Sequence, residues 1–211
     1  METLECIKTR RSIRKYADTP LEFEKIGNVL EAGRCAPSAG NLQDWKFILV
    51  TEFETRRKIS EACLQQYWME SAPVHIIVCA QPEKSERFYG ERGRKMYSIQ
   101  NCAAVAQNMV LAANDQGLGA CWVSAFHEDM LRSAINIPPD VIPQVVVTLG
   151  YSDEHPAEPP KFPIENVVFI EKWGNRIRDI AAFMEHYSEH VQKAIKSGKE
   201  LIQKTFEKIK Q

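Results

Sequence analysis

The sequence lacks an excess of charge of either sign, since 27 lysines and arginines stand against 28 aspartates and glutamates. This balance argues against a nucleic-acid-binding or membrane-surface protein, because such proteins carry a basic excess. The sequence also lacks an apolar run close to the roughly 20 residues that span a bilayer. Its charged start, Met1 to Glu5, is unlike a signal peptide. We therefore expect a cytoplasmic protein that binds neither nucleic acid nor membranes.

Paired cysteines and a dinucleotide fingerprint are missing too. The six cysteines include no CxxC pair and several fall within apolar patterns, so we expect buried free thiols and no disulfide framework. No G-x-G-x-x-G motif follows a predicted strand. This argues against a built-in nicotinamide domain and favours a bound mononucleotide over FAD on a Rossmann unit. The length of 211 residues is enough for one large domain with its own core.

The first functional signal is a basic segment near the start of the chain. Residues 10–14 read Arg-Arg-Ser-Ile-Arg and follow a helix predicted over Thr3 to Thr9. The planar fork of arginine can donate two parallel hydrogen bonds to a phosphate, and a serine hydroxyl stands among these arginines. The pattern is typical of a phosphate-binding site. A solvated basic helix end is the simpler alternative.

The second signal follows an amphipathic helix predicted over Leu21 to Cys35, which Pro37 must end. Residues 37–41 read Pro-Ser-Ala-Gly-Asn, and such small residues let a flat ring lie against the backbone. The amides of Asn41 and Gln43 each offer a donor and an acceptor to the edge of a heterocycle. Together the two segments suggest a site for a phosphorylated, planar cofactor, with an ordinary turn as the alternative for the second.

Helical and strand patterns alternate along the chain without clean βαβ repetition, which favours an α+β fold. Strands are predicted over Lys46 to Thr51, Val74 to Ala80, Ala120 to Val123, Gln144 to Tyr151 and, as a short run that could leave its own subunit, Asn166 to Ile170. Further helices are predicted over Glu54 to Gln66, Ser98 to Gln116, Glu128 to Asn136 and, as a charged amphipathic pattern, Asn175 to Gln211.

Two of these regions bear on the site. The helix Ser98 to Gln116 is apolar on nearly every face, so we expect it to be buried, either within one subunit or at a dimer core, and to end at Gly117. The polar run Pro82 to Lys95 is expected to be a surface loop or a mobile cover over the substrate.

These motifs resemble the FMN-dependent nitroreductases. The similarity extends over roughly residues 1–173 and rests on four ordered segments, which are residues 10–14, 36–45, 117–123 and 145–150. It implies a three-layer α/β/α fold with a mixed, largely antiparallel sheet, and an intertwined homodimer with shared FMN sites. The FMN-binding domain would cover residues 1–173, and residues 174–211 would form a helical extension.

The resemblance also assigns roles to individual residues. The flavin phosphate and ribityl chain would be held by Arg10, Ser12 and Arg14, with Arg11 beside them. The isoalloxazine ring would be reached from the other subunit by a loop that contains Pro37, Ser38, Ala39, Asn41 and Gln43. Backbone amides of Ser124 and Ala125 would face flavin N5. Lys161 would reach back to the phosphate, and Gln65 would lie near a further polar contact.

The sequence departs from the family pattern at three places. Asp44 stands where many members have proline, and Ser124 where close relatives often have glycine. Phe162 and Pro163 stand where a second basic residue usually follows Lys161. The first two changes bear on the surroundings of the ring, and the third on the grip of the phosphate.

The resemblance implies an oxidoreductase that passes hydride from NADH or NADPH through FMN to an electron-poor acceptor such as a nitroaromatic or a quinone. The flavin carries the chemistry, so we name no catalytic residue. Alternatives are a flavin-fragmenting or dehalogenating branch of the fold and a non-catalytic flavin-binding protein. A remote alternative is a zinc hydrolase that uses the H-x-x-E-H motif of His186, Glu189 and His190. We expect no metal there, because a zinc site also needs a third ligand downstream and a water-excluding cleft, and only a lysine-rich tail with the acids Glu200 and Glu207 follows.

Overall fold

The computed structural model describes residues 1–176, 182–185, 188–189, 191–193 and 196–197. The chain divides into two compact units, Met1–Glu158 and Pro159–Gln211. The domain boundary expected at residue 173 and the cytoplasmic location stay predictions. Among the described residues, no helix combines the length and the apolar character that crossing a bilayer requires.

Four strands form one sheet in the first unit. They are β1 (Trp45–Val50), β2 (Val74–Ala80), β3 (Gly119–Val123) and β4 (Ile142–Gly150), in the order β1-β2-β4-β3 with all neighbours antiparallel. On the free edge of β3, Ser12 forms a parallel bridge with Ala120. The mixed, largely antiparallel sheet is therefore confirmed, with the four main predicted strands within two residues of their observed ends.

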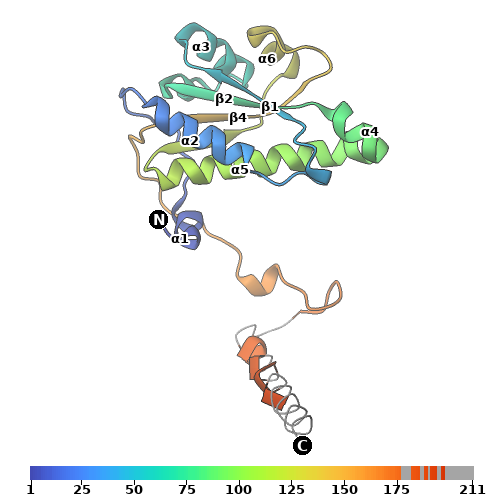
Figure 1. Ribbon diagram of the computed structural model, residues 1–211. Coiled ribbons are helices and arrows are strands. Elements are labelled where there is room, and N and C mark those ends of the chain that lie inside the picture. The colour runs from blue at the N-terminus through green and yellow to red at the C-terminus, as the bar shows by residue number, and fades with distance from the viewer. Residues whose placement is uncertain (177–181, 186–187, 190, 194–195, 198–211) are drawn as a thin grey trace, which may run out of the picture. The chain divides into compact units, whose positions relative to one another are not determined.

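Helices cover both faces of this sheet (Figure 1). Helices α2 (Phe23–Arg34) and α5 (Ser98–Asp115) cover one face, while α3 (Phe53–Ala62) and α6 (Glu128–Ile135) cover the other. Strand β2 is buried on both faces, because successive side chains of a strand alternate between them: Ile76 belongs to one core and Ile77 to the other. The three-layer α/β/α architecture is confirmed.

Helix α5 ends as expected at Gly117, which has a φ of 72°. The Gly117 N–H donates to the carbonyl of Asn114 and the Leu118 N–H to that of Ala113, which are the two hydrogen bonds of a Schellman motif. Most of α5 is buried against the sheet, but Ile99 is 49% exposed within one subunit. The expectation of burial all round is thus met only on the sheet-facing side.

Two predictions of local structure were wrong. The run Pro82 to Lys95 is no loop, since it forms helix α4 (Pro82–Arg92) followed by a π-helical turn, η3 (Gly93–Tyr97). Its polar residues bond within the segment, as Arg94 does with Glu86 at 2.7 Å. The expected strand over residues 166–170 begins within a 3-10 turn, η4 (Ile164–Asn166), and only Phe169 forms a bridge there, with Arg176.

Helix α3 ends earlier than expected, whereas the end of α6 and the described residues within 182–197 of the tail agree with expectation. Helix α3 stops at Ala62, because Leu64 and Gln65 adopt left-handed backbone conformations with φ values of 58° and 59°. Asn136, also left-handed, ends α6. In the second unit, the described residues 182–185, 188–189, 191–193 and 196–197 are helical. The histidines of the zinc motif, His186 and His190, lie outside the described residues.

Candidate functional site

Backbone pairing fixes the basic segment against the sheet. The Ile13 N–H donates to the carbonyl of Ala120 on β3 at 3.0 Å, and the Ala17 N–H donates to that of Tyr151 at 2.9 Å. Gly119 allows this approach, because a Cβ atom there would lie 2.9 Å from Cγ2 of Ile13. The segment thus behaves as an additional short strand beside β3. We call residues 10–14 in this setting the basic corner.

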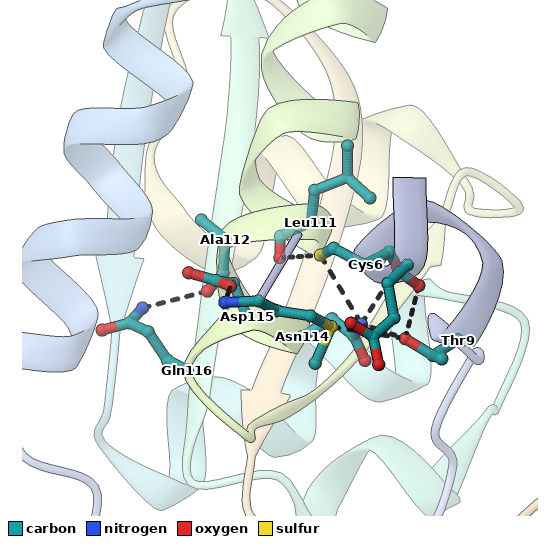
Figure 2. A network of polar contacts seen from close by, with 9 residues as sticks. Cys6, Thr9, Leu111, Ala112, Asn114, Asp115 and Gln116 are labelled. Atoms are coloured by element: carbon teal, nitrogen blue, oxygen red, sulfur yellow. Dashed lines mark hydrogen bonds and ion pairs between the residues drawn. The ribbon is translucent and has the colours of Figure 1, made fainter. Parts of the chain in front are cut away.

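The helix that leads into the basic corner is docked by side chains onto the end of α5 (Figure 2). This helix is α1 (Thr3–Thr9), and the Asn114 amide donates to the Cys6 carbonyl at 3.0 Å and to the Thr9 hydroxyl at 3.1 Å. The Cys6 thiol in turn donates to the Leu111 carbonyl at 3.3 Å. The position of Arg10, which directly follows α1, is therefore set by the C-terminal turn of α5.

The three guanidinium groups of the basic corner differ in their partners. Arg11 donates to the Lys8 carbonyl at 2.7 Å and lies 3.3 Å from the carboxylate of Glu158. In the part of the chain that the structure describes, the guanidinium groups of Arg10 and Arg14 have no hydrogen-bond or ion-pair partner. The side chain of Ser12 faces the thiol of Cys121. The basic corner thus holds two guanidinium groups that have no partner among the described residues, and one hydroxyl group.

A cavity of about 540 Å³ lies beside this corner. Its lining includes Arg10, Arg11, Asn114, Gly119 and His155. Glu154 is also part of the lining, and its carboxylate accepts from the backbone N–H groups of Arg14 at 2.5 Å and Lys15 at 3.2 Å. Because those amides are occupied, an anion here would be bound by guanidinium and hydroxyl groups. Of the residues predicted to bind the phosphate, Arg10 lines this cavity, whereas Ser12 and Arg14 do not, so their shared role stays a prediction.

The second predicted segment forms a tight turn before β1. It contains the 3-10 turn η1 (Ala39–Asn41), and Gly40, Asn41 and Gln43 are left-handed with φ values of 56°, 56° and 47°. The Gln43 N–H donates to the Ser38 hydroxyl at 3.0 Å, and the Gln43 amide donates to Oδ1 of Asn41 at 3.2 Å. Pro37, Asn41 and Gln43 are exposed. The two predicted amides thus lie side by side at the surface. We call residues 37–43 the amide loop.

The basic corner and the amide loop lie at opposite ends of α5. The Ala39 N–H donates to Oδ1 of Asn101 at 3.0 Å near the start of the helix, whereas Asn114 holds α1 at its end. At 1.5 Å per residue, these two asparagines are roughly 20 Å apart along the helix. The two predicted halves of the site are therefore not brought together within one subunit.

A third group of predicted residues follows β3. Ser124 and Ala125 are exposed, and the Ser124 hydroxyl accepts from Nε1 of Trp122 at 3.0 Å. Since Ser12 is paired with Ala120, this turn lies roughly 13 Å from the basic corner along β3 at 3.3 Å per residue. One subunit thus places the basic corner and this turn beside the same strand, β3.

The last two predicted residues are placed less directly. Gln65 is exposed, and its neighbour Gln66 is the residue that donates to the Ala125 carbonyl, at 3.4 Å. Nothing in the sequence distinguished Gln66 from Gln65, because helix α3 was expected to continue through both residues. Lys161 is exposed and belongs to the second compact unit. The roles assigned to Gln65 and Lys161 stay predictions.

Two titratable groups beside the basic corner, the thiol of Cys121 and the hydroxyl of Tyr16, are held in their neutral forms. Burial raises the pKa of the Cys121 thiol, against the smaller opposing effect of Arg14. Burial also raises the pKa of Tyr16, whose hydroxyl lies 2.7 Å from that of Thr148. Neither group is poised to exchange protons near neutral pH. Among the described residues, no group of three His, Cys, Asp or Glu side chains could hold a metal ion.

Sequence reasoning missed one polar cluster, which surrounds Asp44. This carboxylate is fully buried and accepts hydrogen bonds from Ser85, Ser98 and Asn101. The available signal was a set of polar residues, Ser98 and Asn101, on the apolar helix α5. Three positions apart on a helix, they face the same side.

Comparisons with known proteins point to one family. The family model described as the nitroreductase family matches residues 7–68 and 62–151. A protein of Methanothermobacter thermautotrophicus, assigned by its name as an NADH dehydrogenase/NAD(P)H nitroreductase, is 39% identical over 82% of this chain and 88% of its own. The FMN reductase [NAD(P)H] of Bacillus subtilis is 29% identical over 94% of this chain and 86% of its own.

Solved structures agree with this assignment. The crystal structure of a nitroreductase family protein from Clostridium difficile 630 superposes with a TM-score of 0.72. It is 30% identical in sequence, and the match covers 82% of this chain and 99% of that protein. The similarity thus extends through the three layers described above.

Proposed function

The chain belongs to the nitroreductase family, and from that premise we propose that it is an FMN-dependent oxidoreductase. It takes hydride from NADH or NADPH and passes it through bound flavin to an electron-poor small molecule such as a nitroaromatic or a quinone. The observation that carries the proposal is a pair of guanidinium groups, Arg10 and Arg14, that have no partner among the described residues and stand beside Ser12 on a segment paired with β3. The names of the relatives, which include an FMN reductase, support it.

The residues of this chain bind and orient the cofactor. Arg10 and Arg14 hold the phosphate with charge-assisted hydrogen bonds, while Arg11 keeps the segment in place through Lys8 and Glu158. The exposed turn at Ser124 and Ala125 presents backbone donors toward the ring edge. When bound, FMN supplies reversible uptake of hydride. No acid–base residue is needed from the protein, because the flavin carries the chemistry.

We extend the proposal to an intertwined homodimer in which each site is shared. The basic corner and the amide loop lie at opposite ends of α5, so one subunit offers them roughly 20 Å apart. A two-fold axis across α5 would set the end of one helix beside the start of its mate and so join the two halves twice. The half-exposed Ile99 on α5 supports such a contact. The amide loop of one subunit then reaches the ring held by the other.

The proposed function is tested on the protein as purified. It should be yellow, the cofactor released by heat should be FMN, and NADH or NADPH should bleach the bound flavin rapidly without oxygen. A screen of acceptors then separates a reductase from a flavin-fragmenting or dehalogenating enzyme. Flavin that no nicotinamide bleaches indicates a binding protein without turnover. Colourless protein that takes up no FMN on titration contradicts the proposal, and bound zinc without flavin favours the hydrolase.

A further inference from the structure

A buried carboxylate lies directly behind the amide loop. Asp44 is fully buried, and Oδ2 accepts from the hydroxyls of Ser85 at 2.6 Å and Ser98 at 2.7 Å. Oδ1 accepts from the Asn101 amide at 2.7 Å. Within the described ranges, no lysine, arginine or histidine lies at ion-pair distance from this carboxylate. Its negative charge is therefore stabilised by neutral donors alone, which makes each of these hydrogen bonds costly to lose.

The carboxylate fixes the orientation of the Asn101 amide. The Nδ2 group of Asn101 donates to Asp44, so its Oδ1 points the other way and accepts from the Ala39 N–H at 3.0 Å. If the amide were flipped, its oxygen would face the carboxylate and its NH₂ group would face another N–H. The charge of Asp44 thus excludes the flipped amide and thereby fixes the first residue of η1.

The same carboxylate connects the loop to α4. Ser85 and Tyr89 are one turn apart on α4 and share a face. Tyr89 lies over the loop, because a Cβ atom on Gly40 would come within 2.5 Å of its hydroxyl oxygen. The Asp44 carbonyl also accepts from the Gln81 N–H just before α4, at 2.6 Å. Helices α4 and α5 and the amide loop therefore meet at one side chain.

We propose that Asp44 is a positioning residue of the flavin site: through Asn101 it holds the amide loop in the conformation that reaches the flavin ring. The inference rests on the proposed function and on the shared site. In this chain a buried charge does the positioning, and the exposed amides of Asn41 and Gln43 are preorganised by it.

The test compares Asp44→Asn with Ser60→Ala, a buried hydroxyl on α3 across the sheet that donates to the Arg56 carbonyl. Asparagine keeps the size of the side chain and removes its charge and one acceptor oxygen. We expect the dissociation constants of FMN and riboflavin to rise together, by about tenfold, which corresponds to one hydrogen bond to a charged group. In flavin-free protein the Ala39 amide should exchange its hydrogen faster. Ser60→Ala should leave all three quantities as in wild type.

A second variant keeps the test independent of how well Asp44→Asn folds. Asn101→Ala removes the link between the carboxylate and Ala39, so it should raise both dissociation constants to a similar extent. Combined with Asp44→Asn, it should add little further loss, because both changes break one chain of hydrogen bonds.

Three outcomes overturn the inference. One is a folded variant whose flavin affinities and Ala39 exchange stay within about twofold of wild type. Another is full additivity of the two changes. A third is a loss for FMN that exceeds the loss for riboflavin, which would place the effect at the phosphate. Each of these leaves the proposed function intact if the wild type binds flavin and is bleached by a nicotinamide. A wild-type protein that takes up no flavin overturns both.

Discussion

The basic corner and the amide loop are held in place by different kinds of contact. The basic corner is paired through its main chain with β3 and is also held by the side chains of Glu154 and Arg11. Among the described residues, the guanidinium groups of Arg10 and Arg14 take no part in these contacts. The amide loop is fixed by a buried side chain, Asp44, whose partners lie on two helices. Removing the side chain of Arg10 or Arg14 therefore breaks no polar contact among the described residues, whereas removing that of Asp44 breaks three hydrogen bonds. Substitution of Arg10 or Arg14 should therefore change ligand binding alone, whereas substitution of Asp44 should change both the stability of the fold and flavin binding.

The largest effect is expected from removing the carboxylate entirely. In Asp44→Ala, the amide of Asn101 and the hydroxyls of Ser85 and Ser98 lose a buried acceptor, which should lower the free energy of unfolding by about 3 kcal/mol. Arg10→Ala should lower it by less than about 0.5 kcal/mol. Urea unfolding of the two variants without flavin measures both values. An equal decrease in the free energy of unfolding for both variants would contradict the difference between the amide loop and the basic corner.

Next in size is the loss of phosphate binding at the basic corner. Arg10→Ala removes a charge-assisted contact, so the affinity for FMN should fall about ten- to a hundredfold. Riboflavin lacks the phosphate and should be affected much less. Arg57→Ala, which removes a positive charge from the exposed surface of α3, serves as the matched control. If FMN and riboflavin lose affinity equally, Arg10 acts elsewhere than at the phosphate.

A smaller effect tests whether the basic corner depends on its contact with β3. In Gly119→Ala, the new Cβ would lie 2.9 Å from Ile13 Cγ2, so the segment must shift and stability should fall by about 1 kcal/mol. FMN affinity should fall with it. Gly27→Ala is the control, because a Cβ there meets nothing within 4 Å. In a helix this change should be neutral or stabilising. Wild-type FMN binding by Gly119→Ala would show that the contact does not position the donors.

The smallest effect is expected outside the basic corner and the amide loop. His190→Ala changes the H-x-x-E-H motif of the tail, and it should leave flavin content and reductase turnover unchanged. Flavin absorbance per protein and the initial rate with NADH or NADPH measure these quantities. A large fall in turnover would show that the tail is part of the site, and it would contradict a site formed only by the basic corner and the amide loop.

Much of the fold could be predicted because its signals are local. Strand β2 is a short apolar run, and Gly117 supplies the left-handed end of α5. The predicted loop over residues 82–95 failed since a polar composition does not exclude a helix whose charges bond within it, as Arg94 does with Glu86. The extra length predicted for α3 failed because the left-handed Leu64 and Gln65 have no sequence signal such as glycine.

The site divides in the same way. The phosphate-binding role of the basic corner was inferred from residue chemistry, since arginines beside a serine are informative without knowledge of their neighbours, and it stays a prediction. The sequence could not indicate that Arg11 forms an ion pair, because its partner Glu158 lies far along the chain. The role of Asp44 as a buried hydrogen-bond acceptor could not be predicted from the sequence either. Its partners Ser85 and Asn101 are brought to it only when α4 and α5 pack behind the loop.

The central claim is that each flavin site combines the basic corner of one subunit with the amide loop of the other, and mixed dimers test it most directly. In an Arg10→Ala homodimer both sites lack the guanidinium group, and in an Asn41→Ala homodimer both lack the amide. A heterodimer of the two has one site with both defects and one site with neither. Isolated heterodimers should therefore recover up to one tightly bound FMN and the matching reductase activity. Heterodimers that bind FMN no better than the two mutant homodimers would contradict the shared site.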